Sequence, residues 1–210
     1  MIPCSNFESF YDALVEAYNG YGDNESITFG ILLADYQQDE ARQYILNYLQ
    51  DYHEKSGRCF NFFIPGYIAV WDQSPDEDEN INVGGTDYRF SPEMFRSFYQ
   101  SLENQFGITY EENPMLILMS MDNCHLGTAR WIVIDLNTIN RGVRYSGSFF
   151  RDIFEIASRD WSLEAIRNRR RFLYIKGDLL DRLLEDNRLA WLGTVIRNGI
   201  QYYRINEHDD

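Results

Sequence analysis

A polar turn after the first strongly apolar run offers side chains that could do chemistry. Tyr36, Gln37 and Glu40 lie between the apolar run 27–34 and an amphipathic segment that begins near residue 39. In α/β proteins, ligands commonly bind where a strand ends and a helix begins. A phenol, an amide and a carboxylate there can hold a ligand by hydrogen bonds or move a proton. The turn is therefore the first candidate site.

Adjacent thiol and imidazole side chains, Cys124 and His125, form a second candidate. A cysteine nucleophile needs a base, but neighbours in sequence rarely point at one another, and no third orienting group is identifiable. We interpret the pair as part of a surface turn. The remaining cysteines are Cys4 and Cys59, and none of the three lies in a CxxC pair. This usage is typical of a reducing compartment and gives no disulfide framework.

A basic run near the C-terminus is the third candidate. It contains Arg167, Arg169, Arg170 and Arg171. On a helix, consecutive arginines spread around several faces, where neighbouring acidic residues can pair with them. We interpret the run as an anion-binding or interface patch. An ion-paired face or a subunit interface is favoured over contact with RNA or a nucleotide.

The net charge of −14 is unevenly distributed. Residues 1–128 hold 21 acidic and 5 basic residues, whereas residues 129–210 hold 12 acidic and 14 basic residues. Because phosphate contacts supply most non-specific affinity for nucleic acid, we do not expect nucleic acid as a partner. If anything binds this acidic part electrostatically, it is a basic protein surface or a cation. A protein partner or a homo-oligomer is expected. No apolar run approaches the roughly 18 residues that cross a bilayer, which favours a cytoplasmic protein without membrane contact.

The segment 71–88 is predicted to be an acidic insertion. Acidic residues but no basic residue occur between positions 71 and 85, which indicates a solvated loop or a β-hairpin. A calcium site is the alternative, but the spacing does not match an EF-hand loop and the central glycine is missing. We therefore predict no metal there, and no cofactor elsewhere.

Apolar periodicity predicts the elements that position these candidates. Helices are expected over 5–20, 39–55, 92–106 and 149–157, strands over 27–34, 60–70, 114–121 and 130–135, and helical structure from residue 160 onward. The second strand is interrupted at Pro65-Gly66. The first two strands flank a helix, which predicts a parallel crossover, whereas the last two flank a short turn, which predicts an antiparallel hairpin.

Two of the helices carry recognisable end signals. Ser5 and Glu8 have the spacing of a capping box at the start of the first helix. Ser91 precedes a proline at the start of the third helix, and Gly107 follows its end. The inner face of this third helix is predicted to consist of Met94, Phe95, Phe98, Leu102 and Phe106.

The element order strand, helix, strand, helix, strand, strand, helix resembles that of the thioredoxin fold. Two segments carry the resemblance. Asn113-Pro114-Met115-Leu116 resembles the segment in which a cis-proline precedes the third strand, and the segment 32–40 resembles the first strand running into the aromatic-CxxC turn. In that alignment Tyr36 takes the aromatic position, while Gln37 and Glu40 stand where the cysteines would be.

The resemblance implies an α/β protein with a thioredoxin-like mixed sheet, an added N-terminal helix and a helical C-terminal extension. The thioredoxin-like domain is expected over 1–158 and the extension over 159–210. Disulfide exchange needs two thiols, so Gln37 and Glu40 exclude it at this turn. The predicted function is therefore that of a non-catalytic interaction or accessory subunit.

The predicted binding groove consists of Tyr36, Gln37, Glu40, Pro114 and Met115, with the C-terminal helices as a second contact surface. In the resembling family, the cis-proline and the strand edge after it pair with an extended peptide. The alternative is an enzyme that binds glutathione or a nucleotide through Tyr36 or through the patch 167–171.

Overall fold

The described part of the chain contains both helices and strands. The structure, a computed structural model, describes residues 1–20, 26–38, 41, 45, 61–70, 80–137, 150, 151, 153 and 200–204. In order, the elements are β1 (Ile2–Cys4), α1 (Phe7–Gly20), β2 (Ser26–Leu33), β3 (Asn61–Pro65), β4 (Tyr67–Ala69), β5 (Asn80–Val83), β6 (Thr86–Phe90), α4 (Pro92–Phe106), β7 (Met115–Asp122), a 3-10 helix (Leu126–Thr128), β8 (Arg130–Asp135) and β9 (Ile200–Arg204). The predicted mixed α/β class is confirmed.

Six strands form the main sheet, in the order β1-β3-β2-β7-β8-β9. β3 is parallel to both β1 and β2, whereas β7 is antiparallel to β2 and to β8. The parallel crossover and the antiparallel hairpin are both confirmed. Two strands were not predicted. One is β1, and the other is β9, which pairs with β8 where we expected helical structure.

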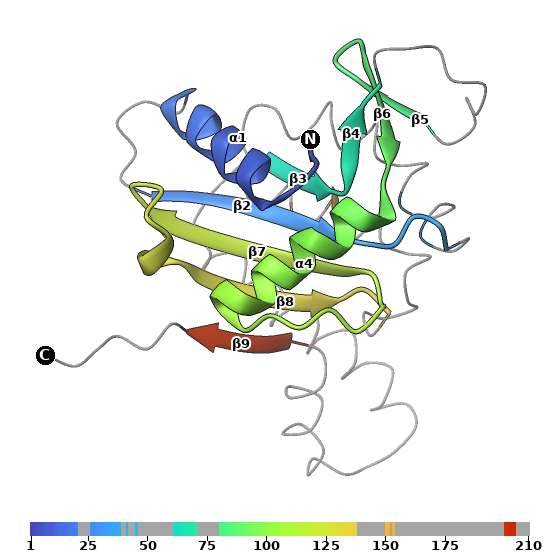
Figure 1. The fold of residues 1–210 in the computed structure, drawn as a ribbon. Coiled ribbons are helices and arrows are strands. Elements are labelled where there is room, and N and C mark those ends of the chain that lie inside the picture. The colour runs from blue at the N-terminus through green and yellow to red at the C-terminus, as the bar shows by residue number, and fades with distance from the viewer. Residues whose placement is uncertain are drawn as a thin grey trace, which may run out of the picture.

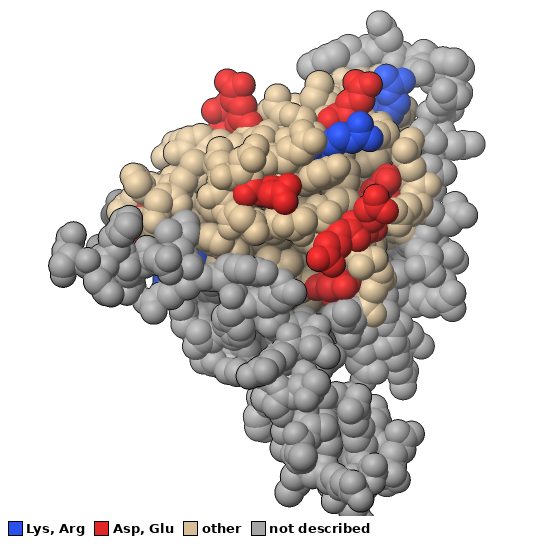
Figure 2. All heavy atoms as spheres, turned by 60° about the horizontal axis from the view of Figure 1, so that its bottom comes forward, with Lys and Arg blue, Asp and Glu red and all other residues tan. Residues whose placement is uncertain are grey.

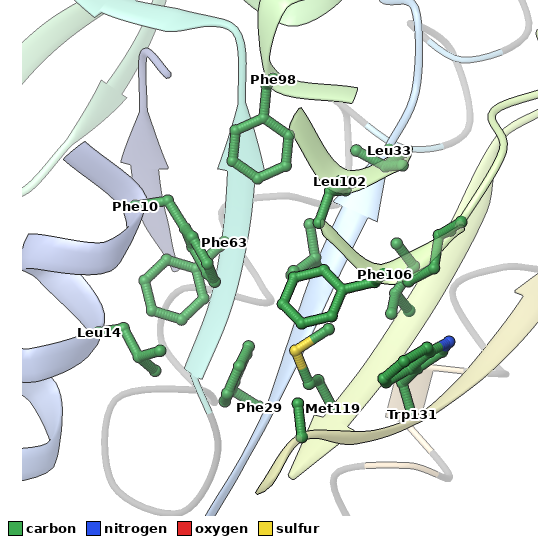
Figure 3. Packing of buried hydrophobic residues seen from close by; sticks show 14 of the residues in the cluster. Phe10, Leu14, Phe29, Leu33, Phe63, Phe98, Leu102, Phe106, Met119 and Trp131 are labelled. Atoms are coloured by element: carbon green, nitrogen blue, oxygen red, sulfur yellow. The ribbon is translucent and has the colours of Figure 1, made fainter. Parts of the chain in front are cut away.

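The two central strands are buried on both faces. Alternate residues of β2, such as Phe29 and Ile31, join one hydrophobic cluster with Phe10 of α1 and Phe98 of α4. Leu32, on the other side of β2, joins a second cluster. α1 and α4 lie over the same face of the sheet (Figure 1). Figure 3 shows their aromatic side chains meeting those of the strands, and this packing accounts for the continuous apolar runs in the sequence.

The ends of α4 match the local sequence signals. The Ser91 hydroxyl accepts a hydrogen bond from the Met94 amide, and Gly107 ends the helix with φ 65°. Phe95, Phe98, Leu102 and Phe106 are buried as predicted. Met94 is wrong as a member of this inner face, because its side chain is 38% exposed.

The start of α1 uses a different residue pair from the predicted capping box. Asn6 Oδ1 accepts a hydrogen bond from the Ser9 amide at 2.9 Å, and Ser9 Oγ accepts one from the Asn6 amide at 3.1 Å. This reciprocal pair lies one residue after the predicted Ser5 and Glu8. The helix begins at Phe7, two residues after the expected start.

Gly66 lets the chain leave the main sheet between β3 and β4. Its φ is 86°, and a Cβ atom there would lie 2.7 Å from Phe95 Cβ and 2.9 Å from Phe90 Cε2. β4 then pairs with β6, and β6 pairs with β5, in a three-stranded sheet. Within the predicted insertion, residues 80–88 belong to the β5–β6 hairpin, as the hairpin interpretation predicted, while residues 71–79 lie outside the described residues.

The proline before β7 is not a cis-proline. No cis peptide bond occurs among the described residues, which include Asn113 and Pro114, so the cis bond that the resemblance implies is not present. Of the two other predicted helices, residues 41, 45, 150, 151 and 153 are described and helical. The remainder of those helices and residues 159–199 lie outside the described residues.

Candidate functional site

The turn 34–38 follows β2 and is organised by Asp35. Asp35 Oδ1 accepts a hydrogen bond from the Gln37 amide at 3.0 Å, and the Asp35 carbonyl oxygen accepts one from the Gln38 amide at 3.0 Å. Aspartate commonly stabilises turns in this way. The side chains of Gln37 and Gln38 are exposed. The turn therefore has an ordered backbone and presents two amide groups.

Tyr36 holds the turn against the protein interior. Its side chain is 2% exposed, and its ring centroid lies 5.5 Å from that of Tyr67 and 5.6 Å from that of Phe90. The sequence analysis placed Tyr36 among the partner contacts. The structure places its ring between the turn and the small sheet, where it anchors the turn.

Pro114 and Met115 lie beside this turn, as the predicted groove requires. In the β2–β7 pairing, Leu33 stands opposite Met115, so Pro114 comes next to the start of the turn. Both residues are buried, and the Pro114 carbonyl oxygen accepts a hydrogen bond from the Leu136 amide at 2.9 Å. β7 pairs with strands on both sides, so it has no open edge for an added peptide strand.

The remaining predicted site residues have no described position. Glu40 and the patch of Arg167, Arg169, Arg170 and Arg171 lie outside the described residues. The structure therefore places Pro114 and Met115 beside the start of the turn, whereas the Tyr36 side chain joins a different hydrophobic cluster from Met115. Among these residues and Gln37, Gln37 is the exposed one.

The loop 108–114 contributes a tyrosine that the sequence analysis missed. Tyr110 Oη accepts a hydrogen bond from the Asp35 amide at 3.2 Å, which ties this loop to the turn. Its ring centroid lies 5.3 Å from that of Tyr99 on α4 and 5.2 Å from that of Phe95. The sequence around Tyr110 is only a weak signal of this role, because its partners come from distant parts of the sequence.

The surroundings of the Tyr110 phenol are apolar and acidic. Burial raises its pKa to about 12; the hydrogen bond from the Asp35 amide lowers it, and the carboxylates of Asp35 and Glu112 raise it again. Glu112 has a φ of 60°, an unusual conformation for a residue other than glycine. We refer to Asp35, Gln37, Tyr99, Tyr110 and Glu112 together as the Tyr110 surface.

The Cys124–His125 pair does not form a catalytic pair. Cys124 is buried in the cluster beneath α1, and burial raises the pKa of its thiol. The His125 ring is exposed, and its Nδ1 accepts a hydrogen bond from the Gly127 amide at 3.2 Å. The surface-turn interpretation agrees with this geometry. Cys4 is also buried, and burial raises the pKa of its thiol.

The described residues offer neither a metal site nor a membrane span. No group of three or more His, Cys, Asp or Glu side chains there is arranged to hold a metal ion. No described helix is long and apolar enough to cross a membrane.

Comparison of the chain with protein-family models, with curated proteins and with solved structures gives no match. The function must therefore be argued from the residues themselves.

Proposed function

We propose that the protein is a non-catalytic, thioredoxin-like interaction module of the cytoplasm that binds a partner protein through the Tyr110 surface. The observation that carries the proposal is the turn after β2. Its backbone is fixed by Asp35, its ring residue Tyr36 is turned inward, and Gln37 and Gln38 face solvent. Amide side chains on a rigid turn suit recognition by hydrogen bonds.

The order of the elements supports the thioredoxin-like part of the proposal. β2, the helical residues 41 and 45, β3, α4, β7, β8 and the helical residues from 150 follow the order that the resemblance requires. The pairing of β2 with both β3 and β7 brings Pro114 beside the turn, although its peptide bond is trans. A trans bond and a fully paired β7 move the expected contact away from the strand and toward the turn and the loop.

The enzymatic alternative is less well supported by this geometry. A tyrosine that activates glutathione must present its hydroxyl to the ligand, whereas the Tyr36 side chain is 2% exposed. The second part of the alternative, nucleotide binding through the patch 167–171, falls outside the described residues.

The proposal is tested by adding bulk and charge at the turn. We expect that a Gln37→Arg, Gln38→Arg variant loses the proteins that the wild-type chain captures from its natural host, identified by quantitative mass spectrometry. A matched control is Gln100→Arg, Asn104→Arg, which makes the same charge change at two exposed positions on the outer side of α4.

Partner capture by the control should equal that by the wild type. Equal partner lists for the wild type and the turn variant would contradict the proposal, provided that circular dichroism shows the same fold in all three proteins. Because all four substituted residues are exposed, the free energy of unfolding of each double variant should lie within about 0.5 kcal/mol of the wild-type value.

A further inference from the structure

We propose that the Tyr110 surface recognises an arginine- or lysine-bearing segment of the partner protein. This inference rests on the proposed function and names the chemistry of the partner. It is carried by the combination of a half-buried aromatic pair with carboxylates around it, on a chain whose first 128 residues are strongly acidic.

The aromatic part of the surface is a supported pair of rings. Tyr99 and Tyr110 are both half-buried, and their planes are inclined at 37°. Phe95 lies behind them, with its ring centroid 5.6 Å from Tyr99 and 5.2 Å from Tyr110. A guanidinium or ammonium group binds such rings when it lies within about 6 Å of a ring centroid. The ring pair is therefore a ready platform for a cationic side chain.

The carboxylates lie where they favour the same kind of ligand. The Asp35 amide donates to Tyr110 Oη at 3.2 Å, Glu112 is an exposed residue of the same loop as Tyr110, and both carboxylates raise the pKa of the Tyr110 phenol. One oxygen of Asp35 already accepts the Gln37 amide, and the carboxylate has a second oxygen with which to accept from a ligand. On α4, Glu103 accepts a hydrogen bond from the Thr109 hydroxyl at 3.1 Å, which adds an acidic group beside the loop.

The surroundings disfavour an anionic or phosphate-bearing partner. Acidic side chains are spread over the described surface, with few basic ones beside them, as Figure 2 shows for one face. An approaching anion would be repelled, whereas a basic segment would be steered toward the surface. Charge complementarity thus selects a basic protein segment as the occupant.

The test measures binding of defined peptides to the full chain. The probe is a fluorescein-labelled peptide of alternating glycine and arginine. Its comparison peptides carry lysine, neutral citrulline or glutamate in place of arginine. Fluorescence anisotropy should give the tightest binding for arginine, weaker binding for lysine, and Kd values at least about tenfold higher for citrulline and glutamate, because both lack the positive charge.

Charge-neutral variants then locate the binding. Asp35→Asn with Glu112→Gln keeps the shape of both side chains, and asparagine can still form the Asp35 turn. We expect a rise in Kd of about tenfold for the arginine peptide. The matched control is Asp12→Asn with Glu16→Gln on the exposed side of α1, which removes the same two charges and should change Kd by less than about twofold, since surface charges far from the ligand are screened.

A second pair of variants tests the rings. Tyr99→Leu should weaken binding, whereas Tyr99→Phe, which keeps the aromatic face, should bind nearly as tightly as the wild type.

Two outcomes would overturn the inference. One is an equal loss of affinity in the two charge variants, which would reveal a general attraction to an acidic protein. Equal affinities for the arginine and citrulline peptides would overturn it as well.

Failure of this inference is distinguishable from failure of the proposed function. If Gln37→Arg, Gln38→Arg abolishes partner capture but the Asp35→Asn, Glu112→Gln variant captures normally, the surface binds a partner of different chemistry and the inference is overturned. If Gln37→Arg, Gln38→Arg captures normally, the proposed function itself fails.

Discussion

Two turns, at opposite ends of the central β2–β7 pair, use their polar groups in contrasting ways (Figure 1). The first turn, 34–38, follows β2 and leaves the side chains of Gln37 and Gln38 in solvent. The second turn, 122–128, follows β7, and several of its polar groups bond to one another. Thr128 Oγ1 accepts from the Asp122 amide and donates to the His125 carbonyl oxygen, while His125 Nδ1 accepts from the Gly127 amide.

Tyrosine hydroxyl groups fix both turns, but from different elements. Tyr110, from the loop 108–114, accepts the Asp35 amide of the first turn. Tyr11 and Tyr18, from α1, donate to the Cys124 carbonyl oxygen and to Asn123 Oδ1 of the second turn. The comparison shows that residues with reactive side chains, such as Cys124 and His125, can have a purely structural role. The amide side chains of an ordered turn, in contrast, remain exposed to a partner.

Removing the buried anchor of the first turn should have the largest effect. We expect Tyr36→Ala to lower the free energy of unfolding by about 3–5 kcal/mol, the usual cost of truncating a buried aromatic side chain. Tyr18→Ala, which truncates the half-buried tyrosine at the second turn, should cost about 1 kcal/mol. Urea denaturation of both variants measures the difference. Equal losses would show that the two turns are anchored equally.

The conservative variant separates the ring from its hydroxyl group. Tyr36→Phe keeps the contacts with Tyr67 and Phe90. It should therefore cost no more than about 1.5 kcal/mol, the net value of a typical hydrogen bond. A loss as large as that of the alanine variant would mean that the hydroxyl group, and not ring packing, holds the first turn.

Adding a side chain at Gly66, next to the aromatic residues that pack around Tyr36, should have the next largest effect. In a Gly66→Ala variant the new methyl group would meet Phe95 Cβ at 2.7 Å, close to the ring of Phe90 that contacts Tyr36. We expect a loss of about 2–4 kcal/mol, from overpacking together with an unfavourable positive φ. Gly84→Ala is the control. It also has a positive φ but nothing within 4 Å of the new methyl group, so it should lose only about 1 kcal/mol.

Elements whose ends depend on neighbouring residues were predicted well. Elements that depend on contacts with distant parts of the chain were missed. Both ends of α4 were predictable because Ser91 and Gly107 act on their own neighbours. Met94 was misplaced because it lies about 100° around the helix from Phe95, at the margin of the apolar stripe. β1 and β9 are short strands whose partners are distant in the sequence. β1 pairs with Phe63 to Pro65 of β3, and β9 pairs with β8.

The sequence predicts the position of the turn after β2 but not the orientation of its side chains. The strand-to-helix turn and its neighbour Pro114 follow from the apolar pattern and the resemblance. The inward orientation of Tyr36 depends on Tyr67 and Phe90, and the role of Tyr110 depends on Asp35, which is 75 residues away in the sequence. No local pattern carries that information.

Removing one hydroxyl group from each turn should have a smaller effect on stability and sharpen the contrast in function. Tyr110→Phe leaves the Asp35 amide without its acceptor, and Tyr11→Phe removes the donor to the Cys124 carbonyl oxygen. Each should cost about 1–2 kcal/mol. Hydrogen exchange at the Asp35 amide should accelerate in Tyr110→Phe alone. Unchanged exchange would contradict the proposed link between the loop and the first turn.

The smallest expected effect is a pH dependence specific to the first turn. The pKa of Tyr110 is raised from an ordinary value of 10 to about 12, chiefly by burial, so folding favours the neutral phenol. The associated stability is therefore fully present below pH 10 and is lost as the pH rises toward 12. Solvent screening limits it to about 1 kcal/mol or less, because Tyr110 is only half-buried. Absorbance at 295 nm should lose a late-titrating phenol in Tyr110→Phe relative to the wild type, and the stability difference between this variant and the wild type should narrow over the same pH range. If the phenol that is lost in Tyr110→Phe titrates near pH 10 instead, the Tyr110 phenol is exposed to water, and the first turn lacks the support that distinguishes it from the second.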